Sequence, residues 1–186
     1  MLVKEGNLRG LSHLKPKAIG CFLAGSLVGR DSHKTVQQKR SLAVLARLID
    51  KAIFEYTEAK EAVESEVKEN KMTFQEILKR DDGQYIFTHI IINHLENCIT
   101  TIARINKIIN NYKANARKKD LMNVRGSIEH VYERIENGLD STPILNISED
   151  SLQIEVAGRD NTALTIKTSD VADEIEDLYN YIRSML

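Results

Sequence analysis

The chain has 186 residues and a formal net charge of −1, with 42% hydrophobic and 28% charged residues. This composition is that of an ordinary globular chain, long enough for one good core and a small appendage. It argues against a protein whose whole surface clamps nucleic acid, although a local basic patch remains compatible with it. No apolar run approaches the roughly 18 residues of a membrane span, so we expect no membrane partner.

Residues 1–34 form an N-terminal segment that contains five of the nine glycines, and we expect it to be partly helical, with a short packed helix near 17–28. Its glycines do not form a phosphate loop, because no Gly-Lys-Ser/Thr sequence follows them. Basic residues before the apolar run 18–28 give a faint likeness to a secretory signal peptide. The basic region is long and the apolar region weak, so a cytoplasmic location is the prediction.

The two cysteines, Cys21 and Cys98, lie in apolar contexts without metal-ligand spacing. We interpret both as reduced core residues of a cytoplasmic protein. The sequence shows no cofactor motif and no metal-ligand set, so it predicts neither a cofactor nor a metal.

Apolar positions at helical intervals predict a long helix over about 36–69, and Thr35 and Gln38 have the spacing of a capping box at its start. The outer face of this helix is interpreted as a solvated acidic surface that consists of Glu55, Glu58, Glu61, Glu64, Glu66 and Glu69. A second long helix over about 84–111 is rich in isoleucine and is expected to be the central core helix. His94 lies on its apolar stripe and is interpreted as a satisfied core or boundary histidine rather than a catalytic one.

After residue 138 the hydrophobic period changes to that of strands. Leu152, Ile154 and Val156 alternate with polar residues, and a second strand around 164–166 follows a turn, with 144–147 as a possible third strand. Ser169 is expected to cap a final helix. Residues 139–186 are therefore predicted to form a small annex, and their acidic character favours a structural or protein-contact role over nucleic-acid binding.

The helix predicted over 124–138 carries the candidate site. Its core stripe consists of Val124, Ile128, Val131 and Ile135. Arg125, Gly126, Glu129 and His130 are expected to point away from that stripe. Arg125 and His130 lie about 140° apart around the helix, too far to close on one small group. A second copy of the helix, related by a two-fold axis, would complete the site, so the geometry predicts a homodimer. The plain alternative is that Arg125–Glu129 and His130–Arg134 are ordinary i, i+4 surface pairs.

No acidic residue lies between Glu96 and Asp120, and we interpret this stretch as the only clearly cationic region of the chain. It contains Arg104, Lys107, Lys113, Arg117, Lys118 and Lys119. Positive potential next to Arg125 would attract a polyanionic substrate. A basic helix C-terminus that offsets the macrodipole would explain Lys107 but not the cluster at 117–119.

Two long antiparallel helices, a basic connector and a helix that begins Arg-x4-His resemble the HEPN superfamily of all-helical domains, which occur in prokaryotic toxins, defence systems and RNA-processing nucleases. The resemblance covers residues 35–138 and is carried by the sequence RGSIEHVYERI. It implies a mainly α fold, an antiparallel helical bundle, here followed by the small β-hairpin or meander and the final helix. One departure is Gly126, because active members of the family usually have Asn, Asp or His after the arginine.

The resemblance further implies metal-independent RNA cleavage at a homodimer interface. His130 would act as general base or acid, Arg125 would hold the phosphate, and Glu129 would position Arg125. Arg117, Lys118 and Lys119 would attract the RNA backbone, and Tyr132 would stack a base.

Two hypotheses follow from the resemblance. The first is a ribonuclease or RNA-binding protein of bacterial toxin-antitoxin or phage-defence type, with RNA, a second copy and an antitoxin or other protein as partners. The second is a non-catalytic helical interaction or scaffold protein that retains the fold without an active cleft. Gly126 favours the second hypothesis, and the basic region favours the first.

Overall fold

The structure is a bundle of helices with one small sheet. The computed structural model describes residues 8–69, 87–109, 116–130, 136, 144–147, 152–157 and 163–186. In chain order the elements are α1 (Ala18–Leu27), α2 (Val36–Glu69), α4 (Phe87–Ile108), α5 (Ala116–Glu129), β1 (Ile144–Ile147), β2 (Leu152–Ala157), β3 (Ala163–Lys167) and α7 (Thr168–Met185). The predicted fold class, mainly helical with a small antiparallel sheet and a final helix, is confirmed.

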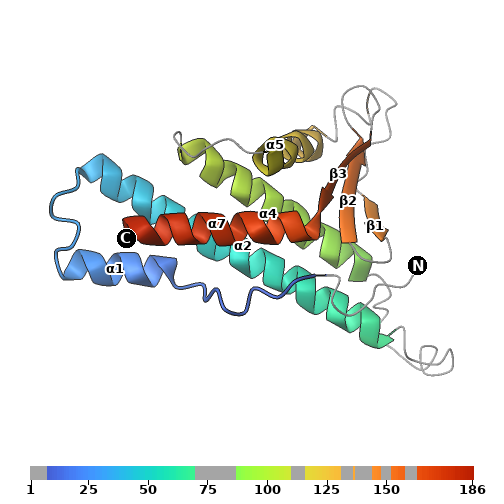
Figure 1. Ribbon diagram of the computed structural model, residues 1–186, viewed down its shortest axis with the longest axis horizontal. Coiled ribbons are helices and arrows are strands. Elements are labelled where there is room, and N and C mark those ends of the chain that lie inside the picture. The colour runs from blue at the N-terminus through green and yellow to red at the C-terminus, as the bar shows by residue number, and fades with distance from the viewer. Residues whose placement is uncertain are drawn as a thin grey trace.

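The two long helices α2 and α4 run antiparallel and form the centre of the bundle (Figure 1). The predicted bounds of α2 agree with the structure, and so does its capping box. The Thr35 N–H donates to Gln38 Oε1 at 2.8 Å, and the Gln38 N–H donates to Thr35 Oγ1 at 3.2 Å. The isoleucine stripe of α4 is buried as expected, with Ile91, Ile102 and Ile105 fully enclosed.

The two cysteines differ in their exposure to solvent. Cys98 lies in the α2–α4 interface, where its Sγ contacts the carbonyl oxygen of Ala52 at 3.5 Å. Burial, together with the charge of Glu55, raises the pKa of the Cys98 thiol far above its ordinary value. Cys21 is exposed on α1, so the prediction that both cysteines are core residues is wrong for Cys21. The reason is that the rest of the molecule covers α1 on one side only.

Hydrogen bonds cap helix α1 at both ends. Asp50 on α2 accepts hydrogen bonds from the backbone N–H groups of Ala18 at 2.9 Å and Ile19 at 3.0 Å, so a carboxylate stabilises the helix N-terminus. At the other end the N–H of residue 30 bonds the carbonyl of residue 25, and the N–H of residue 29 bonds that of residue 26. This is a Schellman motif, and it requires the positive φ of 75° that Gly29 adopts.

Ion pairs and a hydrogen bond join the N-terminal segment to α7. Arg9 forms an ion pair with Asp173 at 2.6 Å and a second one with Glu176, and His13 Nε2 lies 3.1 Å from Glu176 Oε1. The Tyr179 hydroxyl donates to the carbonyl of Lys15 at 3.3 Å. Leucines of this segment enter the same hydrophobic core as α2, α4, α5, β2, β3 and α7.

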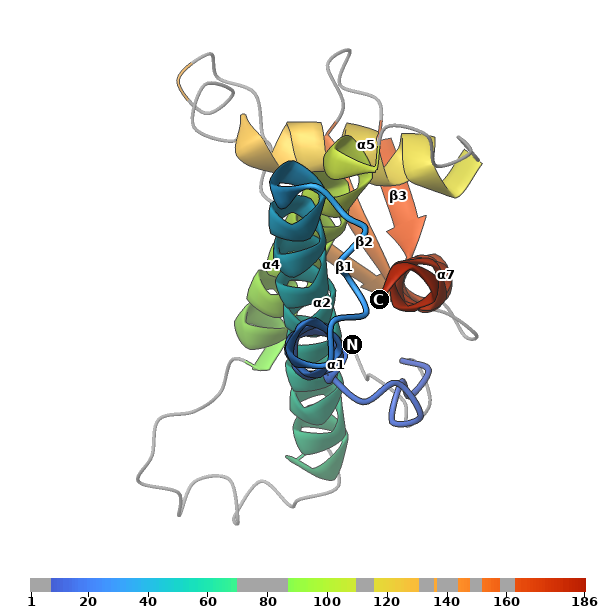
Figure 2. The ribbon, with the colours of Figure 1, turned by 90° about the vertical axis from the view of Figure 1, so that its left-hand side faces the viewer.

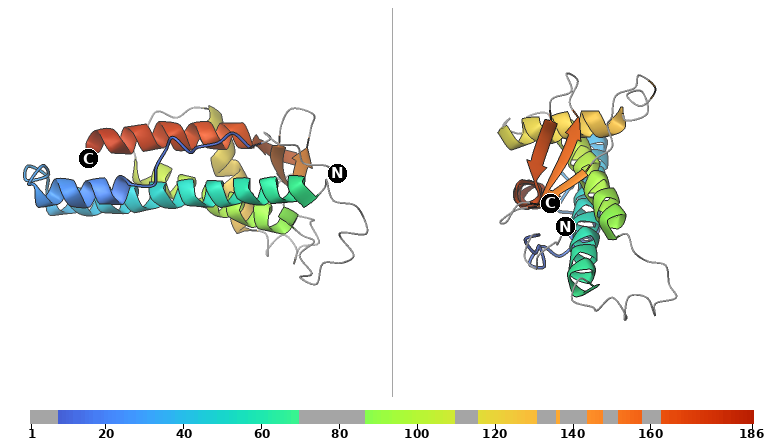
Figure 3. Two further views of the ribbon diagram at one scale, coloured as in Figure 1. Left: turned by 90° about the horizontal axis from the view of Figure 1, so that it is seen from below. Right: turned by 90° about the vertical axis from the view of Figure 1, so that its right-hand side faces the viewer.

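The sheet has the strand order β1-β2-β3, and both pairs are antiparallel. The three strand segments predicted from the sequence are therefore confirmed. Ile154 of β2 pairs with Ile166 of β3, and both side chains are buried. Helices α5 and α7 both pack on this sheet, and α5 crosses its strands (Figures 2 and 3). This packing stabilises the sheet, because a hairpin on its own is only marginally stable in water.

Helix α7 begins at Thr168, after Lys167 in the N-cap position, and no side chain of the described residues caps it. The prediction that Ser169 is the cap is wrong, because the extended strand β3 runs directly into the helix and places residue 169 inside its first turn. The predicted apolar face of α7 is correct: Val171, Ile175, Leu178 and Ile182 are all fully buried. Among the described residues, no helix combines the length and the apolar character needed to cross a bilayer.

Candidate functional site

Helix α5 positions the candidate residues, and it differs from the predicted helix. It begins at Ala116, eight residues before the expected start at Val124, and its described part ends at Glu129. Residues 117–119 therefore lie in the first turn of α5, and the prediction of a basic connector there is wrong. Alanine, arginine and lysine all favour helices, so the basic residues continue the helix instead of interrupting it. The buried stripe begins at Leu121 and continues through Val124 to the partly buried Ile128.

Arg125 lies at the edge of the core and does not point fully into solvent. Its side chain is 18% exposed, and its Nε atom is buried without a hydrogen-bond partner in the part of the chain that the structure describes. Arg125 Nη2 forms an ion pair with Glu129 Oε2, one helical turn further along α5. The guanidinium is thus held in one orientation by a carboxylate that also offsets its charge.

Gly126 and His130 occupy the neighbouring turn. The N–H of His130 donates to the carbonyl of Gly126 at 3.3 Å, so His130 continues the helical hydrogen-bonding pattern just beyond the last residue of α5. His130 is exposed. A Cβ atom placed on Gly126 would meet no atom of the described residues within 4 Å, so this part of the structure leaves the surface beside Arg125 open.

The described basic side chains near α5 are exposed. They are Arg104 and Lys107 on α4 and Lys119 on α5. The side chains of Arg117 and Lys118 lie outside the described residues, and so do Lys113, Tyr132 and the stripe positions Val131 and Ile135. The structure therefore brings Arg125 and Glu129 into contact and places His130 on the next turn, whereas the expected stacking by Tyr132 stays a prediction.

His94 is a satisfied histidine at the boundary of the core, within the prediction of a core or boundary residue. Its Nδ1 lies 2.7 Å from Glu55 Oε2, and Lys51 Nζ lies 3.7 Å from the other Glu55 oxygen. Glu55 is only 7% exposed, so its assignment to a solvated acidic face is wrong. The helical period explains this, because Glu55 lies about 60° around α2 from the buried Ala52. A buried carboxylate facing a partly buried imidazole cross-links α2 and α4.

A second buried polar contact joins α4 to α7. Asn106 Nδ2 donates to Glu174 Oε1 at 3.2 Å, and both residues are buried. Because a substrate cannot reach either side chain, the pair is structural. Within the described ranges, no group of three His, Cys, Asp or Glu side chains is placed to hold a metal ion.

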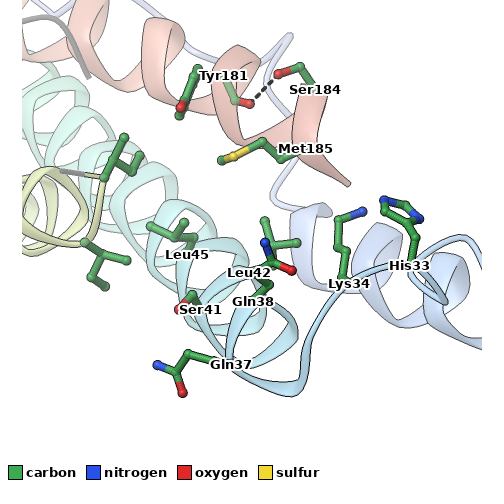
Figure 4. A pocket seen from close by; sticks show the side chains of 12 residues that line it. His33, Lys34, Gln37, Gln38, Ser41, Leu42, Leu45, Tyr181, Ser184 and Met185 are labelled. Atoms are coloured by element: carbon green, nitrogen blue, oxygen red, sulfur yellow. Dashed lines mark hydrogen bonds between the residues drawn. The ribbon is translucent and has the colours of Figure 1, made fainter. Parts of the chain in front are cut away.

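The structure also has an open groove of about 740 Å³ between the start of α2 and the ends of α4 and α7 (Figure 4). Its apolar lining includes Leu42, Leu45 and Ile109, and His33, Lys34 and Gln37 line it at the side of the α1–α2 connection. None of its lining residues belongs to α5, so the groove is separate from the predicted site.

The expectation that residues 96–120 are the only cationic region is wrong. Residues 8–51 contain nine Lys or Arg against two Asp, and no acidic residue lies between Glu5 and Asp31 or between Asp31 and Asp50. Both aspartates are used inside the fold, since Asp31 bonds Ser26 and Lys39 and Asp50 caps α1. The signal for this second basic segment is present in the sequence as the long interval with few acidic residues, although Arg9, Lys39 and Lys51 within it are paired with carboxylates.

Comparisons of the chain with family models, curated proteins and solved structures found no match.

Proposed function

We propose that this protein is a HEPN-like, metal-independent endoribonuclease or RNA-binding protein of bacterial toxin-antitoxin or phage-defence type. The observation that supports the proposal best is the grouping of Arg125, Glu129 and exposed His130 at the end of one helix, beside the open surface at Gly126. These residue types in one place supply a guanidinium for a phosphate and an imidazole for proton transfer.

In the proposed reaction, the 2′-hydroxyl of one nucleotide attacks the adjacent phosphorus atom and the 5′-oxygen of the next nucleotide leaves. The products are a 2′,3′-cyclic phosphate and a free 5′-hydroxyl. His130 takes the proton from the 2′-hydroxyl or gives one to the leaving oxygen, and Arg125 offsets the charge that develops on the phosphate. Two copies related by a two-fold axis would supply one imidazole for each proton transfer.

The ion pair between Arg125 and Glu129 has two effects in this proposal. It fixes the guanidinium, which lowers the entropy lost when a phosphate binds. It also reduces the net positive charge at the site, so the exposed Arg104, Lys107 and Lys119 would provide the long-range attraction for RNA.

The test is to incubate the purified full-length protein with mixed RNA in EDTA and to analyse the fragment ends. We expect fragments that end in cyclic phosphate, and we expect them to disappear with both Arg125→Ala and His130→Ala. Matched controls are Arg47→Ala and His89→Ala, which remove exposed residues of the same types on α2 and α4. Cleavage that persists in both site variants would assign the activity to a contaminant and reject the nuclease proposal. Sedimentation velocity on the same samples would test the homodimer.

The alternative is a non-catalytic helical interaction or scaffold protein. Gly126 favours it, because the chain lacks the polar side chain that follows the arginine in active members of the family. In this alternative the Arg125–Glu129 pair is an ordinary surface contact. Tight RNA binding without cleavage would leave the RNA-binding form of the first proposal, whereas neither binding nor cleavage would favour the scaffold protein.

A further inference from the structure

The connection between α1 and α2 forms one end of the long axis of the molecule (Figures 1 and 3). Large aliphatic side chains are uncovered in and next to it: Leu23 is 55% exposed, Leu27 88%, Val28 71% and Val36 66%. Leu23 and Leu27 lie about 140° and 180° around α1 from the buried Ala18. We refer to Leu23, Leu27, Val28 and Val36 as the apolar tip.

The apolar tip belongs to an ordered part of the fold. The Schellman motif at Gly29 ends α1, and the capping box at Thr35 begins α2. Between them, Asp31 is only 7% exposed and accepts a hydrogen bond from the Ser26 hydroxyl at 3.0 Å, and it pairs with Lys39 at 3.3 Å. The uncovered aliphatic side chains are therefore held outward by a defined turn.

Basic residues outnumber acidic ones in the segment that contains the apolar tip. Residues 18–40 contain four Lys or Arg and one acidic residue, and that acidic residue is the buried Asp31. Arg30 and Arg40 are exposed, and Lys34 is partly exposed next to His33 (Figure 4). Large aliphatic side chains that lie uncovered near one another often mark a contact with a protein or a membrane.

We propose that the apolar tip docks on the surface of a bilayer that contains anionic phospholipids. Charge complementarity selects this occupant, because anionic headgroups pair with Arg30, Lys34 and Arg40 while the aliphatic side chains enter the interface. The shape agrees with it, since a bilayer accepts a protruding end without a matching groove. The expectation of no membrane partner rested on the absence of a span, and peripheral docking requires none. No tip residue lies on α5, so this inference does not depend on the proposed ribonuclease activity.

A vesicle flotation assay with the full-length protein tests the docking. We expect binding to phosphatidylcholine vesicles that contain phosphatidylglycerol, little binding to phosphatidylcholine alone, and weakening with salt. The double variant Leu27→Ser/Val28→Ser should bind at least about tenfold more weakly, because two aliphatic side chains no longer enter the interface. Phe54→Ser is the matched control, since Phe54 is 54% exposed on α2 but lies 18 residues from the start of that helix. Circular dichroism checks that each variant is folded.

A fluorescent label tests the orientation. The variant Val28→Cys in a Cys21→Ser background places one accessible thiol on the tip, because the remaining Cys98 is buried. An environment-sensitive dye at position 28 should shift to the blue with anionic vesicles, and the same dye at position 54 (Phe54→Cys, Cys21→Ser) should not.

Three results would overturn the inference. They are the absence of binding to the anionic vesicles, equal binding by the Leu27→Ser/Val28→Ser variant, and a blue shift at both labelled positions. Sedimentation velocity separates the remaining occupants. Self-association that the double variant abolishes, without vesicle binding, would mean that a second copy covers the tip. A monomer that neither associates nor binds vesicles would leave a protein of another kind as the occupant and would reject the bilayer.

Discussion

Arg125 Nη2 is paired with Glu129 Oε2 across one turn of α5, so the guanidinium expected to hold a phosphate already has a carboxylate beside it. The pair has opposite consequences for binding and for catalysis. The negative charge of Glu129 opposes the approach of RNA. The contact also holds the Arg125 side chain, which would act on the phosphate, in one orientation.

Glu129→Gln separates these two consequences. The amide keeps the size of the side chain but removes its charge, so we expect RNA to bind a few-fold more tightly and with a steeper dependence on salt. We expect cleavage at saturating RNA to fall, because the amide holds Arg125 less firmly. Filter binding and single-turnover cleavage measure the two effects. Asp120→Asn, which removes an exposed acid from the same helix, is the control. Weaker RNA binding by Glu129→Gln would contradict this account of the pair.

Substitutions at Gly126 should be tolerated, because no described atom lies within 4 Å of a Cβ placed there. Gly126→Ala should raise the free energy of unfolding by about 0.5–1 kcal/mol, since glycine is a poor helix former. Gly126→Asn should in addition increase RNA cleavage if the polar residue after the arginine helps to orient the site. Urea unfolding and the cleavage assay measure the two effects. A loss of stability with Gly126→Ala would show that the open surface is filled in solution, for instance by a second copy.

His94→Ala should destabilise the protein by about 1–3 kcal/mol, because it leaves the buried Glu55 carboxylate without its closest partner. His89→Ala, on the exposed side of α4, is the control and should change stability by less than about 0.5 kcal/mol. Both are measured by urea unfolding. Equal effects of the two substitutions would mean that the contact between His94 and Glu55 contributes nothing specific.

Asp31 should make the free energy of unfolding depend on pH under acidic conditions. Burial by itself would raise the pKa of Asp31, but hydrogen bonds from Ser26 and Lys39 and the charge of Lys39 hold the pKa below its ordinary value. The ionised carboxylate therefore stabilises the folded state at pH values above the unfolded pKa of about 3.9, and this contribution is lost as the pH falls through the lower folded pKa. Asp31→Asn should be less stable than the wild type at neutral pH, and the difference should shrink below about pH 4. Urea midpoints measured across this range would show it, and a difference that is independent of pH would contradict it.

The sequence by itself determined the elements whose signal is local. The bounds of α2 follow from the Thr35–Gln38 capping box and a helical apolar period, and the strands follow from the alternation around Ile154 and Ile166. The burial of the α4 stripe and the satisfied state of His94 also follow from position on a helix. The extension of α5 back to Ala116 was not predicted, because the basic residues at its start were taken for a connector.

Only the tertiary structure decided which residues are buried when their sequence contexts are similar. Cys21 and Cys98 both lie in apolar runs, yet Cys21 lies on an uncovered side of α1 while Cys98 faces α2, so one thiol is exposed and the other buried. Glu55 looks like any other glutamate of α2 until α4 is packed against it. The exposure of the apolar tip has the same origin. Periodicity describes a helix alone, whereas burial is a property of the surfaces that meet it, and those surfaces come from distant parts of the chain.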